Sequence, residues 1–132
     1  MNVEILRSSV VDGREVVMFR SANCLARARW KARYKAETGR LYSVEFDLKD
    51  PIGMLRPVDA GAREPGIYMD SSGENVLLCG VLEAVEDDGV GFIRVAQDCL
   101  FMCETSPGWT EVGRRIVLTV RPEDLEMTPI GG

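Results

Sequence analysis

Apolar and polar residues alternate in several short stretches of the chain, and residues that favour turns separate these stretches. The clearest stretch is LYSVEFDL at 41–48, where every second side chain is apolar. A period of two residues places alternate side chains on opposite faces of a β-strand, one buried and one exposed. We therefore expect a half-buried strand at 41–48, with Glu45 and Asp47 on its exposed face.

The stretch ARARWKARY at 26–34 has the same period, with Trp30 and Tyr34 on one face. The other face carries a basic stripe of four residues, Arg27, Arg29, Lys31 and Arg33. A helix over Cys24–Glu37 is the alternative, because Ala, Arg and Lys are good helix formers. A helix would spread the four cations around its circumference, so the pattern favours a strand. A helix here would change the fold class to α+β.

Thr38-Gly39 supplies a turn between these two stretches. We therefore expect 26–34 and 41–48 to pair as a hairpin, with the basic stripe beside Glu45 and Asp47. Opposite charges on paired strands stabilise a sheet by roughly 0.2–1 kcal/mol for each pair. Four cations against two carboxylates would leave a positive excess on this face.

Further strands are expected on both sides of this pair. Asp12-Gly13 and Asp87-Asp88-Gly89 are hairpin signals, and Gly80 in an apolar run suggests a bulge or a sharp bend. The expected strands are 1–10, 15–20, 75–86, 91–96, 99–104, 114–121 and a short segment at 125–130. Short strands at regular spacing, without a long helix, predict one all-β domain over residues 1–132, a small sandwich or barrel. Gly80 favours the barrel, because strongly coiled strands need such a kink.

The residues from Asn75 onward carry a resemblance to a known fold. They comprise the kinked strand NVLLCGVLEAVE, the turn EDDG, the strands GFIRVA and CLFMCE, and then VGRRIVLTV with a terminal DLEMTP. This order resembles an OB-type five-strand barrel, and LYSVEFDL before a variable loop is similar to a segment of small, uncharacterised bacterial OB-like proteins. The resemblance implies a binding module, since such folds bind oligonucleotides, oligosaccharides or proteins on one face and its loops.

Composition narrows the function classes. The net charge is -5, which repels a polyanion at long range and mildly favours a basic protein partner. No run approaches the roughly 18 apolar residues of a membrane span. The first residues include acids and an arginine where a signal peptide would be apolar. We therefore expect a cytoplasmic protein with no membrane partner.

The chemistry-bearing residues argue against catalysis. The chain has no histidine, which excludes His-based triads, His general bases and His-containing metal sites. Cys99 and Cys103 would lie roughly 13 Å apart on one strand, too far for a mutual disulfide or a shared metal. Cys24 and Cys79 complete the cysteines, and we expect all four to be reduced, buried thiols. No nucleophile–base pair or phosphate loop is present, so we predict no enzyme activity, no metal site and no cofactor.

The leading hypothesis is a protein-binding module, such as an inhibitor or immunity-type protein that caps a basic partner. Its expected contacts are four carboxylates, Glu45, Asp47, Asp87 and Asp88. Ile52–Gly66 is the longest loop and a further expected contact. Trp109 lies in another loop and is a candidate anchor, because tryptophan is enriched at binding hot spots.

The alternative hypothesis is single-stranded nucleic-acid binding through the basic stripe. Such grooves combine cations with aromatic side chains on which bases stack. The period of two residues places Trp30 and Tyr34 on the face opposite the cations, which argues against stacking. A small-molecule or oligosaccharide site in the barrel mouth is neither supported nor excluded by the sequence.

Overall fold

A computed structural model describes residues 1–22, 24–49, 58–59, 63–104 and 112–131. These residues form an all-β fold whose only helix is the short 3₁₀ turn η1 (Pro122–Asp124). The strands are β1 (Asn2–Val11), β2 (Arg14–Ser21), β3 (Cys24–Trp30), β4 (Leu41–Leu48), β5 (Val58–Asp59), β6 (Gly66–Met69), β7 (Val76–Val85), β8 (Val90–Ala96), β9 (Cys99–Glu104), β10 (Arg115–Val120) and β11 (Leu125–Pro129). Within the described part of the chain, no helix has the length and apolar character needed to cross a membrane.

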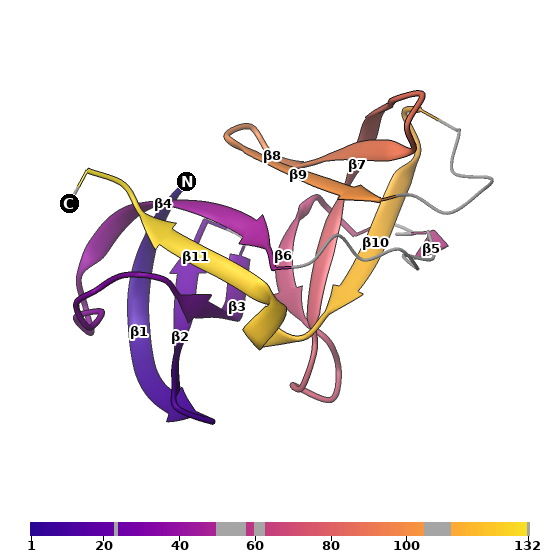
Figure 1. The fold of residues 1–132 in the computed structure, drawn as a ribbon. Helices are drawn as coiled ribbons and strands as arrows, with labels where there is room; N and C mark the ends of the chain where they lie inside the picture. The colour runs from indigo at the N-terminus through magenta and orange to yellow at the C-terminus, as the bar shows by residue number, and fades with distance from the viewer. Residues whose placement is uncertain (23, 50–57, 60–62, 105–111, 132) are drawn as a thin grey trace.

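Five strands close a barrel in the order β1–β2–β3–β11–β4 and back to β1 (Figure 1). β11 pairs in parallel with β3, whereas the other four pairings are antiparallel. This arrangement is consistent with an OB-like barrel. Ala26 and Ala28 point inward from β3 and are fully buried. These small side chains leave room for the rings of Phe19 and Phe46, whose centroids lie 5.2 Å apart.

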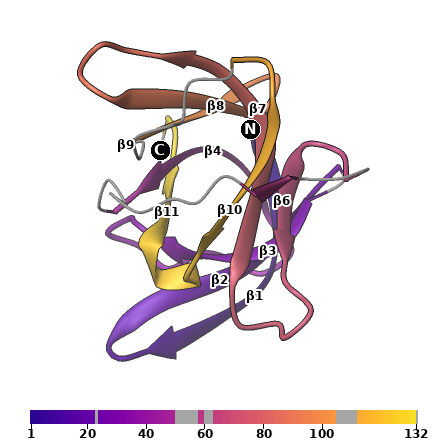
Figure 2. The ribbon, with the colours of Figure 1, turned by 90° about the vertical axis from the view of Figure 1, so that its right-hand side faces the viewer.

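A second layer of strands continues from the other side of β3 (Figure 2). It runs β6–β7–β10–β5, and β8 and β9 extend from β7 as a hairpin over one end of the barrel. β7 pairs with β6 through residues 76–79 and with β8 through residues 81–85. β10 lies along its other edge. β7 is therefore a central strand, as its apolar sequence predicted.

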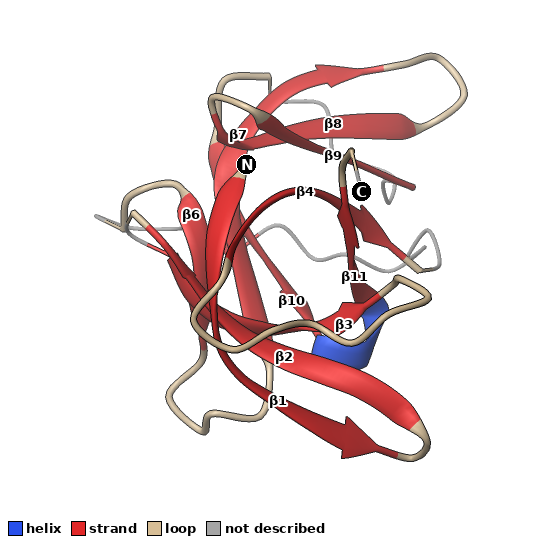
Figure 3. Cartoon of the chain, turned by 90° about the vertical axis from the view of Figure 1, so that its left-hand side faces the viewer, coloured by secondary structure: helices blue, strands red, loops and turns tan. Residues whose placement is uncertain are grey.

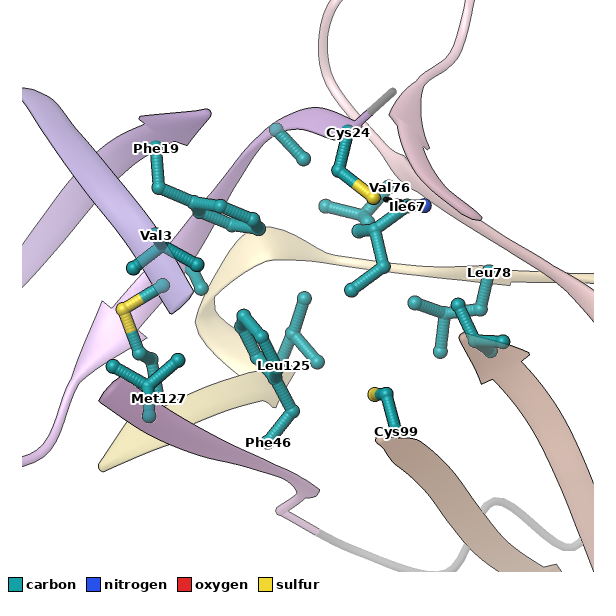
Figure 4. Packing of buried hydrophobic residues seen from close by; sticks show 14 of the residues in the cluster. Val3, Phe19, Cys24, Phe46, Ile67, Val76, Leu78, Cys99, Leu125 and Met127 are labelled. Atoms are coloured by element: carbon teal, nitrogen blue, oxygen red, sulfur yellow. Dashed lines mark hydrogen bonds between the residues drawn. The ribbon is translucent and has the colours of Figure 1, made fainter. Parts of the chain in front are cut away.

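One hydrophobic core serves both layers. Figure 4 shows side chains from the barrel and from the second layer in one cluster, with Phe19, Leu125 and Met127 on one side and Ile67 and Leu78 on the other. The backbone N–H of Ile67 donates a hydrogen bond to the buried sulfur of Cys24 at 3.3 Å. The two layers therefore stabilise each other through shared burial.

The predicted all-β barrel is confirmed, and so is the strand reading of the segment after Cys24. The helix alternative over Cys24–Glu37 is wrong, because β3 runs through this segment. The strand ends at Trp30, however, where Lys31 N–H donates to the carbonyl of Met127. Arg33 and Tyr34 consequently lie beyond the strand, and the predicted length of 26–34 is too long.

The predicted hairpin between 26–34 and 41–48 is wrong. β4 pairs with β1 on one edge and with β11 on the other, and β11 lies between β4 and β3. The strands from Asn75 to Val120, in which the OB-type pattern was recognised, form the second layer instead of the barrel. The pattern of the sequence predicted most strands, although β5 and β6 were not among them. The closure of the barrel depends on β11, which is distant in sequence from β3 and β4.

The hairpin turn at Asp12-Gly13 is confirmed, with φ of 51° and 76° at these two residues. Positive φ at both central residues is typical of the tight turns that match the twist of paired strands. Of the bulge or sharp bend expected at Gly80, the bulge lies instead between Leu82 and Ala84.

Asp70 organises the turn between β6 and β7. Its carboxylate accepts hydrogen bonds from the Ser72 hydroxyl at 2.6 Å, from the Asn75 side chain at 3.0 Å and from the amides of Glu74 and Asn75. These bonds, with that of Ser72 the largest cause, lower the pKa of Asp70 from 3.8 to about 2. The ionised form of this side chain therefore stabilises the folded state.

We expect this turn to contribute to the acid sensitivity of the fold. The pKa of Asp70 is lower in the folded than in the unfolded chain, so its contribution is complete above about pH 4 and is lost as the pH falls towards about 2. Asp70→Asn should lower the Tm at neutral pH and reduce the drop in Tm between these two pH values. Ser72→Ala should give an intermediate result. An Asp70→Asn variant with the acid dependence of the parent protein would contradict this role.

Candidate functional site

A groove of about 240 Å³ separates β4 from the start of β9. Its walls are Val44–Asp47 on β4 and Asp98–Leu100 at the β8–β9 turn. Figure 3 shows β9 passing beside β4 at the end of the barrel that the β8–β9 hairpin covers. Two segments that are about fifty residues apart in the sequence therefore form one surface feature.

The rim of this groove is acidic. Glu45 and Asp47 are exposed on the outward face of β4, as the alternation predicted. Neither carboxylate has an ion pair or a hydrogen bond with another described residue. Asp98, at the turn before β9, adds a third carboxylate and lies 3.1 Å from the amino nitrogen of Met1. The groove therefore carries two uncompensated negative charges.

Asp47 lies opposite Glu126 in the β4–β11 register, so two carboxylates occupy neighbouring positions. Like charges opposite each other destabilise a sheet. Glu126 is compensated from its other side by Arg29 at 3.7 Å and Lys31 at 3.5 Å. Those two cations therefore pair with Glu126, and Asp47 has no ion pair with another described residue.

The side chains that lie beneath the groove are apolar, whereas the surface that lines it is mainly polar. Phe46 and Cys99 are buried, and the Phe46 ring contacts that of Phe101 with centroids 6.5 Å apart. Burial is the main cause that raises the pKa of the Cys99 thiol to about 12, so this thiol is neutral. Leu100, 38% exposed, adds an apolar side chain to the rim. Acidic walls beside the partly exposed Leu100 side chain suit lysine or arginine, which have charged heads and aliphatic stems.

Asp87 and Asp88 do not belong to this groove. They lie in the β7–β8 turn, and Asp88 accepts a hydrogen bond from the Val90 amide at 3.1 Å. The seven residues of β8 separate this turn from Asp98, a distance of about 20 Å at the usual strand rise. The four carboxylates expected to act together are therefore divided between two places, and Asp98 replaces Asp87 and Asp88 beside Glu45 and Asp47.

The basic stripe is partly neutralised. Arg27 donates a hydrogen bond to the carbonyl of Gly73 at 2.5 Å, and Arg29 and Lys31 share Glu126. The carboxylate beside the cations is thus Glu126 and not Glu45 or Asp47, because β11 lies between β3 and β4. Arg33 is exposed in the connection that follows β3.

The two aromatic residues of this region are not on one face. Trp30 is buried, as predicted, and its indole N–H donates to the carbonyl of Tyr34 at 2.8 Å. Tyr34 is 43% exposed and lies in the connection beyond β3, so the prediction that it lies behind the cations is wrong. Its neighbours Arg33 and Lys35 are also exposed.

Two predicted contacts lie outside the described residues. Trp109 is one of them, and residues 52–57 and 60–62 of the Ile52–Gly66 loop are the other. At the described end of this loop, the guanidinium of Arg63 lies over the ring of Tyr68, 5.6 Å from its centroid. The loop end therefore packs onto β6.

The described residues contain no group of acidic and sulfur side chains arranged to hold a metal ion. Cys24, Cys79 and Cys99 are buried free thiols, as predicted, and the side chain of Cys103 lies outside the described residues. A second hollow, of about 420 Å³, lies at the end of the barrel between Met1, Ala22, Gly66 and Gln97.

The alternation of the sequence identified Glu45 and Asp47 as exposed candidate residues, but it did not identify Asp98. The sequence places Asp98 only in a two-residue polar turn between two expected strands. Comparison with known proteins adds no identity: no family model, no curated protein and no solved structure matches the chain.

Proposed function

We propose that the protein is a non-catalytic binding module that holds a basic segment of a partner protein in the groove between β4 and β9. The observation that supports it is the pair of uncompensated carboxylates, Glu45 and Asp47, on the rim of this groove. The acidic net charge of -5 favours the same class of partner. An inhibitor or immunity-type protein of the bacterial cytoplasm would use such a surface to cap a basic partner.

The groove dimensions and chemistry favour an extended segment over a folded surface. Its volume of about 240 Å³ holds a few side chains, and the carboxylates of Glu45 and Asp47 lie on its β4 side. A segment with alternating lysine and apolar residues would place its cations beside these carboxylates and its apolar side chains beside Leu100. This alternation defines the probe for the experiment.

The test is a titration with a fluorescent eight-residue peptide of alternating lysine and valine. The paired variant Glu45→Gln/Asp47→Asn should bind at least about fivefold more weakly, because exposed ion pairs contribute modestly. The control variant Asp87→Asn/Asp88→Asn removes the same charge far from the groove and should bind like the parent protein. Equal weakening in both variants, or no binding by the parent protein, would contradict the proposal.

Single-stranded nucleic-acid binding is the second candidate. It is favoured by the exposed ring of Tyr34 beside Arg33 and Lys35, a combination that suits a base and its phosphates. A labelled oligothymidylate should then bind with an affinity that falls steeply as salt rises from about 50 to 200 mM. Tyr34→Ala should weaken binding about tenfold through lost stacking. An affinity independent of salt would exclude this candidate.

A further inference from the structure

The outward side chains of β1, β2 and β3 form a cluster of cations that takes no part in the groove. We infer that this cluster is a second interaction surface, which binds an acidic segment of a protein. The basic face is defined by five side chains, Arg7, Arg14, Arg27, Arg29 and Lys31. β11 lies between it and the acidic rim on β4, so the two surfaces are separate. The inference is therefore independent of the proposed function.

Strand register brings these cations together from different parts of the chain. Arg7 on β1 and Arg27 on β3 both pair with Met18 on β2, so they lie on either side of it. Two strand spacings place their Cα atoms about 10 Å apart. In the neighbouring row, Val16 on β2 pairs with Arg29 on β3. The cations therefore surround a buried valine and a half-buried methionine.

Arg7 and Arg14 are the least compensated cations of the basic face. Both side chains are exposed, and neither has an ion pair with another described residue. The Arg7 guanidinium contacts the Met18 sulfur at 4.0 Å. Figures 1 and 3 show the β1–β2 hairpin extending beyond the barrel, and residues 7–14 are all exposed there. A partner can therefore reach both guanidinium groups.

The ion pairs on this face leave a positive excess. Arg29 and Lys31 share a single carboxylate, that of Glu126, at 3.7 and 3.5 Å. One of these two positive charges is therefore not balanced by the pair. Arg20 and Glu4, at the end of the face nearer the chain terminus, form an ion pair at 2.6 Å and cancel each other.

Arg27 also keeps its charge. Its guanidinium donates a hydrogen bond to the carbonyl of Gly73, which is a neutral group. The same turn carries Asp70 and Glu74, but the described residues show no ion pair between either carboxylate and Arg27. Asp70 instead accepts hydrogen bonds from its own turn. Asp12, at the tip of the β1–β2 hairpin, likewise has no ion pair with a described residue.

An acidic protein segment suits this face better than a nucleic acid does. Single-stranded nucleic acids bind where aromatic rings stack on their bases, but Val16 and Met18 lie among these cations. Phe19 and Trp30, the aromatic residues of β2 and β3, are buried. The net charge of -5 repels a long polyanion, whereas a short segment responds mainly to charges within about 10 Å at about 0.1 M salt. Guanidinium groups also bind carboxylates through paired hydrogen bonds.

The test is a titration with a fluorescent eight-residue peptide of alternating glutamate and alanine. The variant Arg7→Gln/Arg14→Gln should bind at least about fivefold more weakly, because it removes two exposed cations without breaking an ion pair. The control variant Arg94→Gln/Arg115→Gln removes the same charge from β8 and β10 and should bind like the parent protein. No binding by the parent protein, or equal weakening in both variants, would overturn the inference.

Two further measurements separate an acidic protein segment from other acidic ligands. An eight-nucleotide oligothymidylate should bind more weakly than the peptide. Tighter binding that is lost in Arg7→Gln/Arg14→Gln would assign the face to a nucleic acid and overturn the inference. In sedimentation at low salt, the parent protein and this variant should behave alike. A dimer that forms only in the parent protein would assign the face to a second copy of the chain, which also contradicts the inference.

Discussion

Replacing Gly80 with alanine is expected to lower the free energy of unfolding by about 2–3 kcal/mol, because the fold leaves no room for a side chain there. A Cβ atom at this position would lie 2.5 Å from the carbonyl oxygen of Arg94 and 2.8 Å from a methyl group of Ile93. The first of these atoms belongs to the backbone of β8 and cannot move without disturbing its pairing with β7. Urea denaturation monitored by tryptophan fluorescence measures the loss.

Gly39→Ala is the matched control for this experiment. Gly39 has a φ of +85° and open space around its Cβ position, so alanine there would cost only the backbone preference, about 1 kcal/mol. The difference between the stability losses of the two variants measures the cost of the contact between an added Cβ atom at Gly80 and β8. Equal losses of stability would mean that β7 and β8 are not as close at Gly80 as the structure shows.

Leu125→Ala is expected to cost about 3 kcal/mol, because it removes a fully buried side chain from the strand that closes the barrel. β11 joins β4 to β3, and its inward side chains fill the interior between them. Thr128→Ala, on the exposed face of the same strand, should change stability by less than about 0.5 kcal/mol. The same denaturation experiment checks both variants. Similar effects for the two would contradict the inward placement of Leu125.

The sequence predicted the strands well because alternation is a local property. Tyr42, Val44 and Phe46 are buried and Glu45 and Asp47 exposed, as the period of two residues requires. Strand partners depend on closure of the whole sheet. The turn at Thr38-Gly39 suggested a hairpin of the 26–34 segment with β4, but β11 takes that place and brings Glu126 beside the cations.

The candidate site was predictable only in part for the same reason. Glu45 and Asp47 could be assigned to an exposed face from β4 alone. Their neighbour Asp98 could not, because its position depends on the β8–β9 hairpin folding over the end of the barrel. Asp87 and Asp88 share the residue type and a turn setting with Asp98, yet they lie at the other end of β8. The composition therefore indicated an acidic surface. Only the fold showed that Glu45, Asp47 and Asp98 lie around one groove.

The central claim is that the groove between β4 and β9 is the surface that binds a basic segment. The most direct test is a titration of ¹⁵N-labelled protein with the lysine–valine peptide, followed by amide chemical shifts. The largest changes should cluster at Phe46, Asp47, Asp98 and Leu100, which line the groove. Changes that are scattered over the surface, or that concentrate in the β7–β8 turn at Asp87 and Asp88, would contradict the account.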